Sequence, residues 1–258
     1  MTTGNDPAEA VRALGIRASA EAIRALVTHA TKSQMSPAQT LLELATLEKR
    51  ERDMRNLAAR SKAATIGPAK PLDRFDWTHP RSIERALFEE LHETLGFIER
   101  GENVLFRGQA GVGKSTLAKH LGLAALAKGY SVRFTTLAAA LADLLRRESI
   151  PAIERRLRRY THCDLLIVDE LGYVPCDSDA ADLLFRIVSN RHESRAVVIT
   201  TNLAYKQWGT VFADAPCLGA LVDRFAQHCH VLDIDADSWR EKERKEGLDK
   251  KRALKKRR

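Results

Sequence analysis

The sequence predicts an α/β fold in which a parallel, doubly wound sheet follows a small all-α N-terminal domain. Three observations predict it. Apolar residues within 8–62 recur at helical spacing, which favours a group of helices. Beyond residue 100, short apolar runs alternate with helical segments, as in chains that build a parallel sheet. The runs at 165–168 and 196–199 are apolar at every position, and such strands are buried on both faces.

Length and composition are those of a globular protein. The chain has 258 residues, of which 44% are hydrophobic, enough for one large domain with a packed core beside a small one. No apolar run approaches the ~20 residues of a membrane-spanning helix, and the first residues carry no secretory signal. The 4 cysteines show no metal-binding or disulfide spacing. We therefore expect a cytoplasmic protein that does not enter a membrane.

Positive charge is concentrated at the C-terminal end. The whole chain carries +8, and residues 240–258 hold 11 Lys/Arg against 4 Asp/Glu, a net charge of +7, so the rest is close to neutral. A basic tail at 241–258 is typical of an arm that binds a polyanion such as nucleic acid. The alternative is a tail that only keeps the protein in solution.

The N-terminal domain, expected at 1–66, is predicted to consist of helices. Two short helices are expected at 8–14 and 21–29, the second with Ser19 as its N-cap. A long helix then begins at the Ser-Pro pair of residues 36–37, which stand in the order favoured at a helix start.

Within the long helix, the mixed-sign run at 48–53 suits a solvated face with ion pairs four residues apart. Its alternative use is as a contact surface for another subunit or for DNA. A linker rich in proline and glycine at 65–71 leads into the main domain, expected at 67–240. Phe75 and Trp77 follow the linker, and either cover a nucleotide base or pack in the core.

The main domain is predicted to alternate strands with helices. Gly129 is a usual end for the helix that precedes it, and the alternation of apolar and polar residues at 231–234 suits an edge strand. The expected strands are 104–106, 132–135, 164–168, 196–200 and 231–234, and the expected helices are 83–98, 115–128, 138–147, 151–160, 181–191 and 218–226.

The first strand runs into a glycine-rich loop that a helix follows at once. Residues 108–115 read G-Q-A-G-V-G-K-S, the phosphate-binding pattern in its context of strand, loop and helix. Glycines let the loop N–H groups point at phosphates, and the positive end of the helix dipole faces the same anion. Lys114 would reach the β- and γ-phosphates, and the Ser115 hydroxyl would hold Mg²⁺. The sequence therefore predicts a nucleoside triphosphate site whose contacts are Gly108, Gln109, Ala110, Gly111, Val112, Gly113, Lys114, Ser115 and Thr116.

Acidic residues end the third strand, where ligands of open α/β sheets bind. Asp169 would orient Mg²⁺, and Glu170 can polarise a water for in-line attack on the γ-phosphate. Nucleotide kinases need no such base, so this pair favours an ATPase. The fourth strand ends in Asn202, whose amide can hold the attacking water or a γ-phosphate oxygen, unless it belongs to a polar turn.

Four blocks of the sequence resemble the IstB-type helper ATPases of bacterial insertion sequences. They read G-Q-A-G-V-G-K-S, L-L-I-V-D-E-L-G-Y, V-I-T-T-N-L and L-V-D-R-F-A-Q-H-C-H-V-L-D-I-D-A-D-S-W-R, and the resemblance extends over about 73–240. The N-terminal helices resemble the small domain of those helpers. The resemblance implies an AAA+ P-loop NTPase, close to DnaC helicase loaders and DnaA-type initiators, with ATP and Mg²⁺ as cofactors.

The resemblance also implies roles for single residues. Asn202 matches the sensor-1 asparagine, and Arg224 matches the arginine finger given to a neighbouring subunit's nucleotide, which would make hydrolysis depend on a homo-oligomer. Arg240 matches a sensor-2-like, ATP-contacting position, although Trp239 stands where the family has tyrosine. The alternatives are a local ion pair with Asp223 for Arg224, and membership of the basic tail for Arg240.

The helix expected at 151–160 carries four arginines. AAA+ initiators place an extra helix here that can face DNA, so the resemblance makes these arginines candidates for sequence-independent phosphate contacts. A solvated arginine face is the alternative. The candidates are Arg155, Arg156, Arg158 and Arg159.

These inferences lead to an ATP-dependent helper that binds duplex DNA and serves a cognate transposase during target selection. A helicase loader of the DnaC kind would use the same ATPase with another partner. A small-molecule phosphotransferase and a nucleotide-gated scaffold are further alternatives. The adjacent His228, Cys229 and His230 enter a strand on alternating faces without a fourth ligand, so we expect no metal there.

Overall fold

The computed structural model describes residues 6–146, 149–173, 176–212, 215–239 and 241–244. It divides into two compact units, Met1–Lys62 and Ala63–Arg258. Among the helices in the described ranges, none combines the length and the apolar character that crossing a membrane requires.

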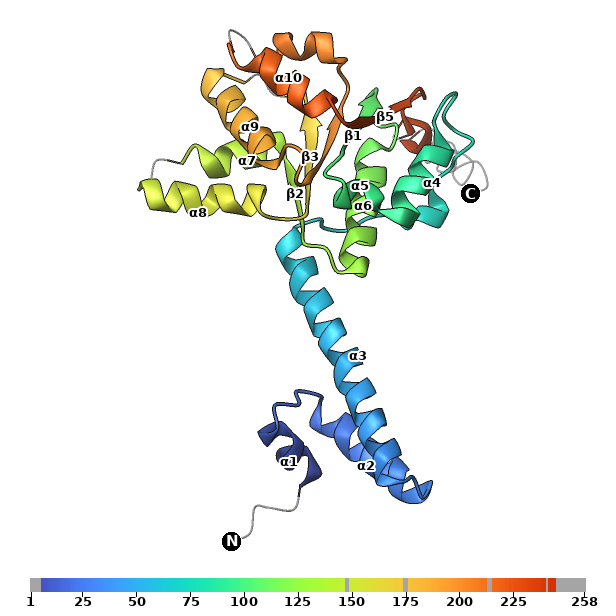
Figure 1. Ribbon diagram of the computed structural model, residues 1–258. Helices are drawn as coiled ribbons and strands as arrows, with labels where there is room; N and C mark the ends of the chain where they lie inside the picture. The colour runs from blue at the N-terminus through green and yellow to red at the C-terminus, as the bar shows by residue number, and fades with distance from the viewer. Residues whose placement is uncertain (1–5, 147–148, 174–175, 213–214, 240, 245–258) are drawn as a thin grey trace, which may run out of the picture. The chain divides into compact units, whose positions relative to one another are not determined.

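The first unit contains the three helices expected near the N-terminus: α1 (Pro7–Ala13), α2 (Ala20–Lys32) and α3 (Pro37–Ala64), whose last two residues lie beyond the unit's boundary (Figure 1). The predicted N-cap of α2 is confirmed, because the Ser19 hydroxyl accepts the Ala22 N–H at 3.3 Å. The small apolar core of this unit consists of Ala8, Ala18 and Ile23, with Leu44 and Leu47 of α3 packed against them.

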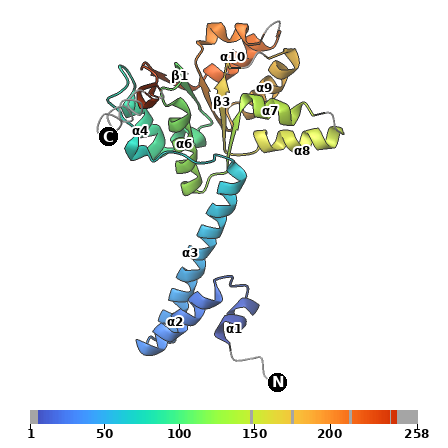
Figure 2. The same cartoon turned by 180° about the vertical axis from the view of Figure 1, so that it is seen from behind.

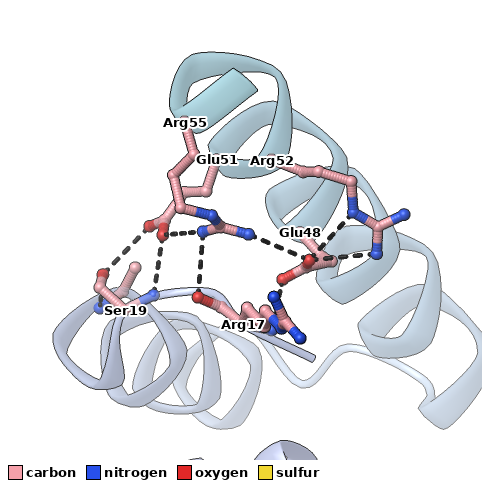
Figure 3. A network of polar contacts seen from close by, with 7 residues as sticks. Arg17, Ser19, Glu48, Glu51, Arg52 and Arg55 are labelled. Carbon is pink, nitrogen blue, oxygen red and sulfur yellow. Dashed lines mark hydrogen bonds and ion pairs between the residues drawn. The ribbon is translucent and has the colours of Figure 1, made fainter. Parts of the chain in front are cut away.

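Acidic side chains of α3 bind the turn that precedes α2 (Figure 3). Glu48, only 6% exposed, accepts the backbone N–H of Arg17 at 2.8 Å and pairs with Arg52 at 3.1 Å. Glu51 accepts the N–H of Ser19 at 2.8 Å and its hydroxyl at 3.0 Å. The expected ion pairs four residues apart are therefore present, but the two acids also face inward and close the N-cap turn of α2 onto α3.

The second unit is built on a sheet of five parallel strands in the order β2-β3-β4-β1-β5. Chain order and spatial order differ, so the crossovers place helices on both faces, and the predicted doubly wound sheet is confirmed. β5 lies at an edge beside β1, as its alternating sequence predicts. The strands are β1 (Asn103–Gly108), β2 (Val132–Thr136), β3 (Leu165–Leu171), β4 (Ala196–Thr201) and β5 (Cys229–Ile234).

Two apolar cores lie on opposite faces of this sheet (Figures 1 and 2). In β3, Leu165 and Ile167 enter one core and Leu166 and Val168 the other, as period-two strands buried on both faces require. The first face is covered by α4 (Arg85–Thr94), α5 (Gly96–Glu99) and α6 (Lys114–Lys128). The second is covered by α7 (Leu137–Leu144), α8 (Ile150–Thr161), α9 (Ser178–Arg191) and α10 (Leu218–Ala226), with the 3₁₀ segment η2 (Tyr205–Thr210); η1 (Leu72–Arg74) precedes α4.

The segment predicted as a linker packs against β2 and α6 of the second unit. Ile66 is buried in the first core, and the Thr65 hydroxyl donates to the carbonyl of Phe134 at 2.6 Å. Lys119 of α6 donates to the carbonyl of Pro68 at 3.0 Å. These contacts hold residues 65–68 along β2 and α6, which brings the following residues to the phosphate loop.

An ion cluster joins the beginnings of β1 and β5. Arg100 binds both Glu102 oxygens at 2.8 Å, and His230 Nε2 lies 2.9 Å from Glu102 Oε2. The hydrogen bonds from Arg100 are the main cause that lowers the pKa of Glu102, to about 2. Partial burial opposes this shift, and the hydrogen bond with His230 adds to it.

This lowered pKa predicts a loss of stability in acid. A carboxylate whose pKa falls on folding stabilises the protein above its unfolded pKa, 4.5, and loses that contribution as pH falls toward 2. We expect urea unfolding between pH 5 and 3 to lose about 1 kcal/mol more in the wild type than in Glu102→Gln, after allowance for solvent screening. Parallel acid profiles for the two proteins would contradict the assignment.

Candidate functional site

The phosphate loop connects β1 to α6, as predicted. Gly113, the N-cap of α6, has φ 101°, and a Cβ there would lie 2.5 Å from the Phe75 ring. Gly111 has φ 82°, and a Cβ there would strike the Ser238 hydroxyl. Both positions require glycine for conformation and for space. The loop therefore keeps its backbone open to an incoming anion at the N-terminus of α6.

The two side chains that follow the loop point inward. Lys114 is 6% exposed, and its Nζ donates to the carbonyls of Gly108 at 2.8 Å and Gln109 at 2.7 Å. The Ser115 hydroxyl donates to Asp169 Oδ1 at 2.8 Å. The predicted loop residues and the predicted acid of β3 thus meet directly.

The end of β3 contains a β-bulge at its two acids. Val168 pairs with Ile199 and Leu171 with Thr201, so two residues of β3 lie opposite one residue of β4. Asp169 is 5% exposed, whereas Glu170 is exposed and has φ 64°. A left-handed glutamate costs about 1–3 kcal/mol and is typical of functional sites, and a bulge re-aims the side chains beside it.

A threonine of β4 contacts both acids, although the sequence pointed to Asn202 at this strand end. The Thr200 hydroxyl donates to Asp169 Oδ1 and accepts the N–H of Glu170 at 3.0 Å. The sequence does mark Thr200, because it is the polar residue that ends the apolar run at 196–199. Its hydrogen bonds with Asp169 and Glu170, however, depend on the bulge.

Lys114, Ser115, Glu170 and Thr200 border one pocket of about 380 Å³, a size typical of small-molecule sites, which span roughly 300–1,000 Å³. Its wall contains Glu170 and Thr200 together with the loop residues that follow Gln109. Gly108 and Gln109 contribute through their carbonyls, which bind Lys114. The loop residues in the wall are Ala110, Gly111, Val112, Gly113, Lys114, Ser115 and Thr116.

Aromatic rings also line the pocket. Phe75, His79 and Trp239 border it, and the rings of His79 and Trp239 meet edge to face at 4.9 Å. Trp77 instead packs against Phe88 in the core at 5.4 Å. Both rings pack against the first core, and Phe75 in addition lines the pocket.

Residues after β5 contact the phosphate loop and the segment that precedes η1. The N–H of Trp239 donates to the Gly111 carbonyl at 3.0 Å, and Glu243 pairs with Lys70 at 2.7 Å. The pKa of Glu243 is lowered, mainly by its hydrogen bond with the Lys70 ammonium and to a smaller extent by a hydrogen bond with the Trp239 side chain. Residues 241–244, expected at the start of the basic tail, are helical, and 245–258 lie outside the described residues.

The donor set beside the loop suits Mg²⁺. The Ser115 hydroxyl and the Asp169 carboxylate are oxygen ligands, which Mg²⁺ prefers, and they already lie within 2.8 Å of each other. Lys114 supplies the positive charge next to them. The residues present therefore fit a magnesium nucleotide.

Comparison with known proteins identifies the family of this chain. A family model described as "IstB-like ATP binding protein" matches residues 9–247. The chain belongs to this family. An IS21 insertion-sequence ATP-binding protein of Pseudomonas aeruginosa is 33% identical over 223 residues, covering 86% of this chain and 84% of the relative. An IS5376 ATP-binding protein of Geobacillus stearothermophilus is 31% identical over 226 residues, covering 88% of this chain and 90% of the relative.

Solved structures agree on the fold. The structure of DnaI has a TM-score of 0.55 at 16% identity and covers 66% of this chain and 92% of its own. The replication initiator DnaA bound to AMPPCP and single-stranded DNA has a TM-score of 0.52 at 19% identity, over 69% of this chain and 56% of its own. The IstB-like chain therefore has the AAA+ P-loop fold that its sequence predicts.

Asn202 and Arg224, for which the sequence resemblance implies roles, are not among the residues that line the pocket. Asn202 is exposed after β4, with its side chain oxygen over Gly172. Arg224, half-buried on α10, contacts two residues of α9: its guanidinium donates to the Ser189 hydroxyl and lies 4.9 Å from the centre of the Phe185 ring. Arg240 lies outside the described residues.

The arginine-rich helix α8 divides its arginines between two faces. Arg155, Arg158 and Arg159 are exposed and lie three and four residues apart, on one side of the helix. Arg156 is 7% exposed, and it donates to the carbonyl of Asp143 at 2.8 Å. The prediction that all four arginines contact DNA phosphates is therefore wrong for Arg156, because helical spacing turns its side chain toward α7.

Histidines and cysteines near β5 bind protein groups. Cys229 accepts the Tyr205 hydroxyl at 3.5 Å, and burial raises the pKa of its thiol to about 11, which disfavours the thiolate that metals require. His230 binds Glu102. Among the residues that the structure describes, no group of three or more His, Cys, Asp or Glu could hold a metal ion.

Proposed function

We propose that this IstB-like protein hydrolyses ATP with Mg²⁺ in the pocket between the phosphate loop and the ends of β3 and β4. The observation that carries the proposal is the meeting of an inward-pointing Lys114, the Ser115–Asp169 pair and a left-handed Glu170 around one pocket. A site that only bound nucleotide would need the loop but not an exposed, strained acid in its wall.

In this proposal each side chain has a separate task. Lys114 and the loop N–H groups hold the β- and γ-phosphates, and Ser115 and Asp169 hold Mg²⁺, which when bound neutralises charge on the phosphates. Glu170 accepts a proton from the attacking water. Phe75 and Trp239, which also line the pocket, offer apolar faces for the base.

We further propose that hydrolysis serves an insertion-sequence transposase on duplex DNA. The support is the naming of the relatives, which are insertion-sequence ATP-binding proteins, together with the exposed arginines of α8 and the basic C-terminal residues. Contacts from arginine to phosphate are independent of base sequence. A helicase loader of the DnaC kind remains the alternative, and binding of the N-terminal unit to a replicative helicase would favour it.

The test measures ATP turnover and duplex binding together. We expect duplex DNA to stimulate turnover, and replacement of Arg155, Arg158 and Arg159 by alanine to weaken duplex binding by at least ~10-fold and to reduce the salt slope by up to ~2.7, since each phosphate contact contributes about 0.9. Fluorescence anisotropy on duplexes of unrelated sequence, over a series of salt concentrations, measures both quantities.

A triple arginine-to-lysine variant is the matched control, because it keeps the charge and should keep most of the affinity. Equal DNA affinity in the alanine variant and the wild type would remove α8 from the interface. A wild type whose turnover ignores duplex DNA would contradict the DNA-dependent part of the proposal, and absence of ATP turnover would contradict all of it.

A further inference from the structure

One residue of β4 lies opposite both acids of β3. Val168 pairs with Ile199 and Leu171 with Thr201, so Asp169 and Glu170 together face the single intervening residue, Thr200. In such a bulge the extra residue loses its regular ladder partner. Here the N–H of Glu170 donates instead to the Thr200 hydroxyl at 3.0 Å.

The Thr200 hydroxyl both donates and accepts a hydrogen bond. It donates its own proton to Asp169 Oδ1, the oxygen that also accepts from Ser115. A hydroxyl has one proton to donate and lone pairs to accept with, so the two bonds are compatible. Thr200 is 1% exposed, and water is therefore a poor substitute for it. One side chain thereby ties the carboxylate of Asp169 to the backbone of Glu170.

This arrangement bears on the strain at Glu170. Its φ of 64° is costly for a glutamate and persists only where neighbours fix it. The Thr200 hydroxyl binds the N–H of that same residue, next to the strained torsion. Without the hydroxyl, the N–H of Glu170 would lose this partner, next to the strained torsion that directs the side chain.

We infer that Thr200 is a positioning residue for hydrolysis: it holds the general base Glu170 and the magnesium-binding Asp169 in register across the β3–β4 bulge. The inference rests on the proposed function, in which Glu170 activates water. Thr200 lies in the pocket wall, but the inference gives it no direct contact with the reacting atoms. Its effect is on turnover rather than on nucleotide affinity.

The neighbouring threonine provides a matched comparison. Thr201 is also buried, at 0% exposure, but its hydroxyl donates to the carbonyl of Leu171 at 2.7 Å and accepts the N–H of Leu203 at 3.1 Å. Both of these partners are backbone groups, and Thr201 is not among the described residues that line the pocket. Thr200→Val and Thr201→Val therefore remove the same group from adjacent buried positions, and only the first touches the acids.

The experiment compares Thr200→Val, Thr200→Ser and Thr201→Val with the wild type. Calorimetry with ATP and Mg²⁺ gives Kd and the binding stoichiometry, a turnover assay gives kcat and KM, and thermal unfolding gives Tm. For Thr200→Val we expect kcat to fall by about 10–100-fold with KM and Kd within about threefold and unchanged stoichiometry, the pattern of a loss confined to the transition state. Thr200→Ser should restore kcat to within about threefold, because it keeps the hydroxyl.

Other results would overturn the inference. A wild-type kcat in Thr200→Val would do so, as would equal losses of kcat in the two valine variants together with equal losses of Tm or stoichiometry, since these indicate a general structural effect. Failure of Thr200→Ser to recover turnover would also count against it. A wild type that binds ATP without hydrolysing it would instead overturn the proposed function, so the two failures are distinguishable.

Discussion

Arg224→Ala is expected to lower ATP turnover by about 10³–10⁵-fold while ATP binding is kept, if Arg224 acts on the nucleotide of a neighbouring copy. The proposed reason is electrostatic: a guanidinium supplied in trans stabilises the charge that develops as the γ-phosphate departs. In its own copy Arg224 does not border the pocket and contacts Ser189 and Phe185 of α9. A role in hydrolysis therefore requires a second copy.

Mixing two inactive variants tests this requirement. Arg224→Ala keeps an intact pocket and lacks the arginine, whereas Lys114→Ala keeps the arginine and lacks the phosphate contact. A mixture should recover part of the wild-type turnover, because some interfaces combine one intact pocket with one intact arginine. Arg186→Ala, at an exposed arginine of α9, is the control for loss of surface charge. Full turnover by a sample shown by sedimentation to be monomeric would exclude the trans arrangement.

The sheet was predictable because its strands are buried on both faces. Four consecutive apolar residues at 165–168 leave a strand no solvent-facing side, and the same holds for 196–199. The phosphate loop was predictable for a different reason: its glycines are required by backbone torsion and by space, as Gly113 shows. Helix ends were predicted less well, and α7 ends at Leu144, three residues before the expected end at 147.

The pocket's remaining parts depend on contacts between segments far apart in sequence. Thr200 meets Asp169 only because a bulge shifts β3 against β4, and no local pattern marks the bulge. Trp239 reaches Gly111 through the packing of residues after β5 on the loop. Arg156 faces inward although the other arginines of α8 are exposed, which follows from helical spacing once the apolar side of the helix is known. The candidate residues of the loop and of the β3 end could therefore be predicted from local sequence patterns, whereas the contacts of Thr200 and Trp239 depend on tertiary packing.

Glu170→Gln is expected to reduce ATP turnover by about 10²–10⁴-fold, the range of general-base catalysis. The amide has the size of the carboxylate but cannot accept the proton of the attacking water. Because the Glu170 side chain is exposed and the strained φ belongs to the backbone, the variant should fold with an unchanged Tm. ATP affinity should be equal or higher, since removing a negative charge from the wall of a polyphosphate pocket reduces repulsion.

The comparison that isolates this effect uses turnover and binding on the same samples. Glu90→Gln, at an exposed position of α4, removes one charge from the same unit without touching the pocket and should behave as the wild type. Duplex DNA added with ATP should then remain bound to Glu170→Gln for longer than to the wild type, because the triphosphate state persists. Wild-type turnover in Glu170→Gln would show that another group activates the water, and a loss of ATP binding would show that Glu170 holds nucleotide rather than promotes its hydrolysis.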